Sequence, residues 1–187
     1  IGLGIAIERI MFLSRVKKAN KELWDAVYPS IQKGDTEKAL KAVKDNETEI
    51  GRILEYGLTR NRTAKNVEDV ETAMEEALME VMPRLEARTP FIATFANVAT
   101  LLGLLGTVQG LIVAFAAIAN ADPAQKGDLL SSSISVAMNT TAFGLVVAIP
   151  LLLFYAFLQS RTGEVVESLE MASIKLLNAL RQIRNNA

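Results

Sequence analysis

Charge is almost absent from one long window of this sequence, and this limits what the chain can fold into. Between Thr89 and Ser160 the charged side chains are Asp122, Lys126 and Asp128, although the whole chain has 20 Lys and Arg and 21 Asp and Glu. These charges separate two uncharged stretches, 89–121 and 129–160. About 20 apolar helical residues cross a bilayer core of about 30 Å, so each stretch is long enough to span it. We predict two membrane-spanning helices.

The segment between the two stretches predicts a tight connection. Residues 122–128 include Pro123 and Gly127 among polar neighbours, a composition typical of turns. Short cytoplasmic segments carry the excess of Lys and Arg, and here Arg84, Arg88 and Arg161 flank the two stretches on their far sides. We therefore expect a helical hairpin with its loop outside the cell membrane and its flanks in the cytoplasm. The three arginines are also candidates for contact with anionic phospholipid headgroups.

The first residues, 1–14, are apolar except for Glu8, Arg9 and Ser14 and are too short to span a bilayer. We interpret them as the inner end of a further membrane helix, which is truncated in this sequence. A cleaved signal peptide is the alternative, but neither a basic leading region nor a small-residue cleavage site is evident.

The charged segments predict helices outside the membrane. Residues 15–88 form an expected cytoplasmic helical region, with helix caps at Asp35 and Asn66. The helix after Asn66 has an apolar stripe at helical spacing, made of Val70, Met74, Ala77, Leu78, Val81 and Leu85. Residues 161–187 continue the second span as an amphipathic cytoplasmic helix, with apolar Val165, Leu169, Leu176, Leu180 and Ile183. We expect no strands, so the predicted fold class is an all-α integral membrane protein with three transmembrane helices.

Several kinds of chemistry are excluded by composition. The chain has no Cys and no His, which removes disulfides, thiolates, the commonest metal ligand and the commonest general base. The net charge of -1 and the aromatic content of 6% provide neither a basic stripe nor stacking platforms for nucleic acid. We therefore expect no enzyme activity, no metal, no cofactor and no nucleic-acid partner.

Small and hydroxyl side chains stand out inside the two uncharged stretches. Gly103, Gly106, Gly110 and Gly144 predict close helix packing, and Thr107 and Thr141 lie near the middle of their spans. Two interpretations are open for the threonines: packing with local hydrogen bonds, or the lining of a polar pore. No acid, base or His lies in either stretch, so a proton carrier at that depth must come from a partner. The residues therefore suggest a scaffold subunit.

Two motifs carry a resemblance to a known family. Gly106-Thr107-Val108-Gln109-Gly110 in the first span, with Thr141-Ala142-Phe143-Gly144-Leu145 and Ala148-Ile149-Pro150 in the second, resemble the ExbB/TolQ members of the MotA/TolQ/ExbB proton-channel family. Val136 stands where many such members have a Glu, and Gln109 stands where an aromatic residue is often found. These departures suggest a divergent ExbB-like paralogue.

The resemblance implies a scaffold subunit of a proton-driven motor in the bacterial inner membrane. By analogy it forms a ring, a pentamer, around an ExbD- or TolR-like single-span partner that supplies a membrane Asp, and passes energy to a TonB- or TolA-like protein for outer-membrane transport. Thr107 and Thr141 match the family threonines that face that Asp. The implied topology has a periplasmic amino end and a cytoplasmic carboxyl end.

Two alternatives stay open at this point. A flagellar-stator-like subunit would share the same mechanism of proton conduction. A structural membrane oligomer without conduction would use the glycines and threonines for packing alone.

Overall fold

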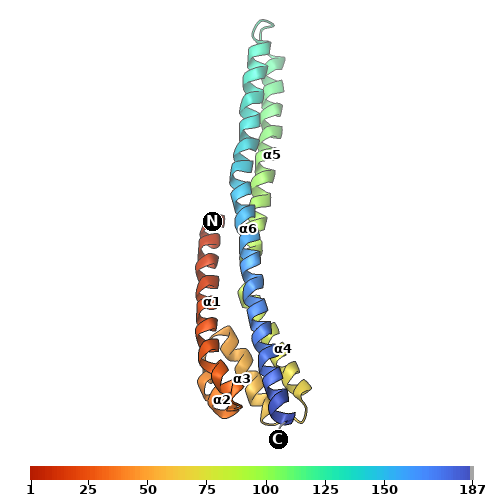
Figure 1. Ribbon diagram of the computed structural model, residues 1–187. Helices are drawn as coiled ribbons and strands as arrows, with labels where there is room; N and C mark the ends of the chain where they lie inside the picture. Colours follow the sequence, from red (N-terminus) through yellow and green to blue (C-terminus); the bar gives the residue numbers. More distant parts are fainter. Residues whose placement is uncertain (186–187) are drawn as a thin grey trace. The chain divides into compact units, whose positions relative to one another are not determined.

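The computed structural model describes residues 1–185, and these form six helices and no strand (Figure 1). The helices are α1 (Gly2–Gln32), α2 (Thr36–Val43), α3 (Glu49–Asn61), α4 (Val67–Glu86), α5 (Thr89–Ala119) and α6 (Lys126–Asn185). The prediction of an all-helical chain is confirmed for this described part. Residues 186 and 187, the end of the predicted segment 161–187, lie outside it.

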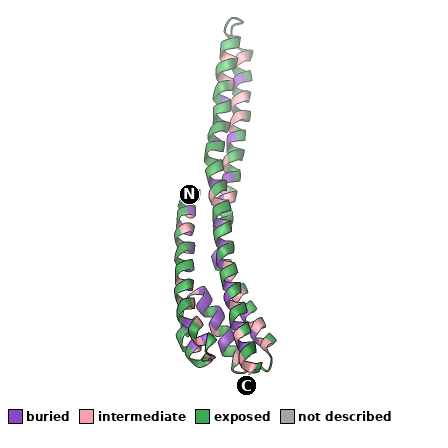
Figure 2. Ribbon diagram, viewed as in Figure 1, coloured by how far each residue is buried: buried purple, intermediate pink, exposed green. Residues whose placement is uncertain are grey.

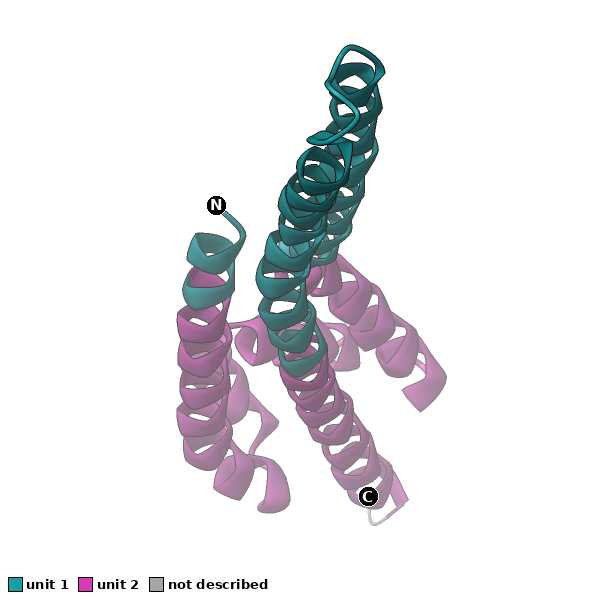
Figure 3. Ribbon diagram, turned by 90° about the horizontal axis from the view of Figure 1, so that it is seen from above, with its two compact units in different colours: residues 1–7, 88–158 teal, residues 8–87, 159–187 magenta. Residues whose placement is uncertain are grey.

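The chain divides into two compact units (Figure 3). The first unit contains residues 1–7 and 88–158, which are the start of α1, all of α5 and the first part of α6. The second unit contains residues 8–87 and 159–187, which include α2, α3 and α4 with the remaining parts of α1 and α6. The uncharged stretches and the charged segments thus fall almost entirely into different units.

The first unit is built on a long antiparallel hairpin of α5 and α6, joined by residues 120–125 (Figure 1). Most of its apolar side chains are exposed in the single chain (Figure 2). The most exposed large ones include Phe143 at 71%, Leu153 at 68% and Leu101 at 63%. Apolar surface this extensive is covered by lipid or by other protein in a stable assembly.

Two helical stretches are long and apolar enough to cross a membrane. They are Val67–Ala119, which includes α4 and α5, and Lys126–Asn185, which is α6. Few residues of their apolar windows are buried, unlike the residues of a core helix in a soluble protein. The predicted pair of membrane-capable helices is therefore present, and the further span expected at residues 1–14 stays a prediction.

A sharp backbone break separates α4 from α5. Arg88 has a φ of 64°, in the left-handed region that costs a non-glycine residue about 1 kcal/mol or more. Pro90 then occupies the first turn of α5, where its missing N–H leaves no helical bond unmade. The change from the charged helix to the uncharged one is thus marked by a helix end and a new start.

The second unit has an apolar core at helical spacing. Five of the six predicted stripe positions of α4 are buried, and Leu78 is half-buried. On α6 the predicted apolar positions Val165, Leu169, Leu176 and Leu180 are buried, and Ile183 is half-buried. Gly57 of α3 allows close packing, because a Cβ there would lie 2.6 Å from the Met74 sulfur. The amphipathic interpretation of these helices is confirmed.

Of the two predicted helix caps, one makes the expected hydrogen bond and the other does not. The Asp35 side chain accepts a 3.0 Å hydrogen bond from the Lys38 backbone N–H at the start of α2, as predicted. Asn66 does occupy the N-cap position of α4, but its side chain makes no capping bond, so that prediction is wrong in its mechanism. Thr48, which the sequence analysis did not identify, caps α3 by accepting from the Gly51 N–H at 3.1 Å.

Candidate functional site

The four glycines predicted for helix packing lie where α5 contacts α6. A Cβ added to Gly144 would lie 2.7 Å from the Ala99 carbonyl oxygen, and one added to Gly103 would lie 3.1 Å from the Thr140 carbonyl oxygen. A Cβ on Gly110 would lie 2.7 Å from the Cβ of Ala137. Each distance is shorter than an ordinary contact, so the two backbones approach as closely as glycine permits. That this face also borders a pore stays a prediction.

The two predicted threonines meet across the same contact. The Oγ1 atoms of Thr107 and Thr141 are 3.0 Å apart, which is hydrogen-bond distance. Thr107 also donates to the Leu104 carbonyl at 2.7 Å, and Thr141 donates to the Gly103 carbonyl at 3.0 Å. Both side chains are partly exposed, so the pair can be reached from outside the hairpin.

The Thr107 and Thr141 hydroxyls make more short contacts than their two protons can turn into hydrogen bonds. Each hydroxyl has one proton, whereas three short contacts join the pair: one to Leu104, one to Gly103 and one between the two hydroxyls. Two of the three can carry a hydrogen bond at one time. The pair can therefore redistribute its hydrogen bonds by rotating hydroxyls, with no movement of the helices.

Thr140 is part of this contact and was not singled out by the sequence analysis. Its hydroxyl donates to the Ala137 carbonyl at 2.7 Å, and a Cβ on Gly106 would lie 2.6 Å from its Oγ1. Gly106 therefore accommodates Thr140. The signal in the sequence was the neighbouring pair of threonines, but sequence alone does not show that both of them contact the partner helix.

The three candidate headgroup-contacting arginines are all exposed in the single chain. Arg84 lies near the end of α4 and Arg88 occupies the cap position of α5. Arg161 lies on α6 and pairs with Glu164 at 3.2 Å. Their exposure is compatible with contact to a lipid headgroup, which stays a prediction.

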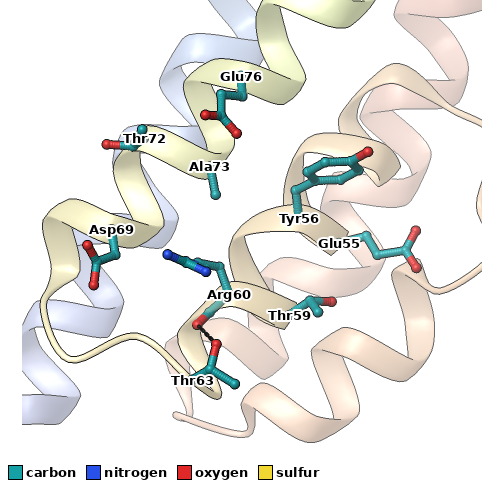
Figure 4. Close-up of a pocket in the computed structure, with 9 residues that line it drawn as sticks. All are labelled: Glu55, Tyr56, Thr59, Arg60, Thr63, Asp69, Thr72, Ala73 and Glu76. Atoms are coloured by element: carbon teal, nitrogen blue, oxygen red, sulfur yellow. Dashed lines mark hydrogen bonds between the residues drawn. The ribbon is translucent and has the colours of Figure 1, made fainter.

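A separate cavity of about 700 Å³ lies between α3 and α4 in the second unit (Figure 4). It is lined mainly by polar side chains. Arg60 of α3 points toward α4, which contributes Asp69 and Glu76, whereas the Glu55 carboxylate of α3 points away from α4. Among the described residues no group of acidic side chains is placed to hold a metal ion. The side chains of α3 and α4 that border this cavity therefore carry charges of both signs.

Comparisons with known proteins point to one family. Residues 45–171 match the model of the MotA/TolQ/ExbB proton channel family. An ExbB homolog of Methanothermobacter thermautotrophicus is 31% identical over 175 residues, which are 91% of this chain and 60% of that protein. The Tol-Pal system protein TolQ of Haemophilus influenzae is 38% identical over 93 residues, 50% of this chain and 40% of that protein.

The match to a further relative covers a larger share of that protein's length. The biopolymer transport protein ExbB of Aquifex aeolicus is 32% identical over 111 residues, which are 59% of this chain and 72% of that protein. The family match covers well over half of the chain and includes all the glycines and threonines of the hairpin contact. The chain belongs to the MotA/TolQ/ExbB proton channel family and is of the ExbB/TolQ type.

Proposed function

We propose that this chain is the scaffold subunit of a proton-driven motor in the bacterial inner membrane. It forms a ring around an ExbD- or TolR-like partner and couples the proton motive force to a TonB- or TolA-like protein that energises outer-membrane transport. Relatives named for biopolymer transport and for the Tol-Pal system support this assignment. The observation that carries it is the Thr107 and Thr141 hydroxyl pair, which lies within the uncharged stretches 89–121 and 129–160.

The chemistry of the pair suits a passing proton carrier. A hydroxyl can donate to a carboxylate and can also accept from a protonated carboxyl group. The two hydroxyls have three contacts but two protons, so they can rearrange their hydrogen bonds. They can then offer either a donor or an acceptor to the same carboxyl group. A partner's Asp can then be hydrogen-bonded in both protonation states, which lowers the cost of placing it at that depth.

The hairpin cannot carry the proton by itself. Threonine hydroxyls do not ionise at physiological pH, and no acid, base or His lies in residues 89–121 or 129–160. The carboxyl group must therefore be supplied by the partner, and this chain orders hydrogen bonds and water around it. The exposed apolar residues of α5 and α6 provide the surface for neighbouring copies and for lipid.

The orientation follows from the arginines. With Arg84, Arg88 and Arg161 on the cytoplasmic side, the loop at residues 120–125 lies in the periplasm and the second unit lies in the cytoplasm. Residues 1–14 are then the inner end of a further membrane helix. The three arginines lie where anionic headgroups gather, and each contributes about 1 kcal/mol there.

Co-purification tests the proposal. The full-length protein is expressed with the product of the adjacent gene, extracted in mild detergent and weighed by native mass spectrometry. We expect a ring of this chain holding a single-span protein with a membrane Asp. A homo-oligomer alone, under conditions that keep known complexes of this kind intact, would favour the structural alternative.

A further inference from the structure

A second, smaller cavity in the second unit has a different chemical character. It has a volume of about 270 Å³ and is bordered by α1, the first turn of α3 and α6. Among the described residues, three lysines line it, Lys17 and Lys21 from α1 and Lys175 from α6, and no acidic side chain does. Like charges gathered in one cavity repel one another, and an anion bound among them removes that cost.

The lysines keep donors available for a ligand. Lys17 pairs with Glu164 at 2.7 Å, but an ammonium group has three donors. Lys175 lies over the rings of Trp24 and Tyr28, at 5.9 and 5.5 Å from their centroids, which orients the ammonium group without using its hydrogen-bond donors. Neither Lys21 nor Lys175 makes an ion pair within residues 1–185.

Asn20 adds an unsatisfied donor at the same place. Its side chain borders the cavity and is 3% exposed. The Oδ1 atom accepts from the Ile50 N–H at 3.2 Å, which fixes the amide so that Nδ2 is the remaining group. Nδ2 is buried and has no hydrogen-bond partner in the described part of the chain. A buried amide N–H without a partner is costly and marks a place where a ligand or water completes the bonding.

We propose that this cavity binds a phosphate-bearing anion. A phosphate monoester carries nearly two negative charges and three strong acceptor oxygens, which suits the three lysines that border the cavity better than a single carboxylate does. The volume suits a small ligand or a headgroup, because pockets for drug-sized molecules start at about 300 Å³. The bound anion would link α1 to α6 and stabilise the second unit.

Thermal unfolding of the full-length protein in detergent provides the first measurement. Inorganic phosphate and glycerol 1-phosphate are titrated against chloride at constant ionic strength and pH. A ligand that binds only the folded state raises the melting temperature in a saturable way. We expect saturation with either phosphate compound and none with chloride.

Matched variants locate the binding. Lys21→Gln and Lys175→Gln remove single charges from the cavity and should each weaken binding about tenfold. Lys18→Gln is the control, because Lys18 is the neighbour of Lys17 on α1, is exposed and does not border the cavity. Asn20→Asp keeps the acceptor for Ile50 and replaces the donor with a negative charge, so it should abolish binding.

A measurement in lipid distinguishes a lipid headgroup from a free phosphate compound as the ligand. The same proteins are placed in nanodiscs of phosphatidylcholine with or without phosphatidic acid, whose headgroup is a phosphate monoester. Stabilisation by phosphatidic acid but not by the soluble compounds, lost in Lys21→Gln and Lys175→Gln, assigns the site to a headgroup, whereas stabilisation by the soluble compounds assigns it to a free phosphate. No saturable effect in either format, or equal losses in Lys18→Gln, would overturn the proposal.

Discussion

The hydroxyl oxygens of Thr107 on α5 and Thr141 on α6 lie 3.0 Å apart, within the uncharged stretches 89–121 and 129–160. Their approach depends on the glycines beside them, since Gly103 and Gly144 let the two backbones come within contact distance. The close packing and the polar pair are therefore one structural unit. Packing supplies the position, and the hydroxyls supply the hydrogen-bonding chemistry.

Thr141→Val separates these two roles. Valine is nearly isosteric with threonine but has no hydroxyl, so we expect the complex to assemble while partner-dependent proton flux in liposomes falls about tenfold or more. Thr141→Ser keeps the hydroxyl and should retain most of the flux. Unchanged flux in Thr141→Val would remove the case for a hydroxyl-lined pathway and leave the threonines as packing residues.

Gly144→Ala tests the packing itself. The added methyl group would lie 2.7 Å from the Ala99 carbonyl oxygen, so the helices must separate, at a cost of about 1–3 kcal/mol. Gly163→Ala on the same helix is the control, because a Cβ there meets nothing within 4 Å and alanine favours the helix. Thermal unfolding in detergent should show a lower midpoint for Gly144→Ala only. Equal midpoints for the two variants would contradict the contact.

Glu164 predicts a dependence of stability on pH. The hydrogen bond and the charge of Lys17 lower the pKa of this carboxyl group below its ordinary value of 4.5, and Arg161 lowers it further. Because the folded pKa is the lower one, the contribution is complete above the ordinary value and is lost as the pH falls through the folded pKa.

The variant Glu164→Gln checks this sign. Its melting temperature should lie below that of the unchanged protein at pH 6, and the difference should shrink between pH 5 and pH 3. Glu167→Gln, a change at an exposed glutamate on the same helix, is the comparison and should track the unchanged protein. A difference that grew on acidification would show that the pair does not stabilise the fold.

Asp35→Ala and Asn66→Ala distinguish a cap that is bonded from one that only occupies the cap position. Asp35 accepts a hydrogen bond from the Lys38 N–H, so its loss should cost about 1 kcal/mol. The Asn66 side chain makes no capping bond, so its replacement should cost clearly less. Denaturant unfolding of the two variants measures the order, and an equal cost for both would show that the Asp35 bond is not formed in solution.

The sequence by itself determined the helical class, the two membrane-capable stretches and the amphipathic faces. Those features depend on composition and on a period of 3.6 residues, both of which are local and can be counted. The family motifs were equally local, since each lies within a few consecutive residues of one helix. The cap positions at Asp35 and Asn66 also followed from local residue types.

Only the tertiary structure decided which groups meet. Neighbouring residues on a helix point about 100° apart, so the choice between Thr140 and Thr141 as the partner of Thr107 depends on how α6 is rotated against α5. The lysine cavity likewise joins α1 to α6 across more than a hundred residues. Contacts between distant segments arise from packing, and no period or motif in one segment contains that information.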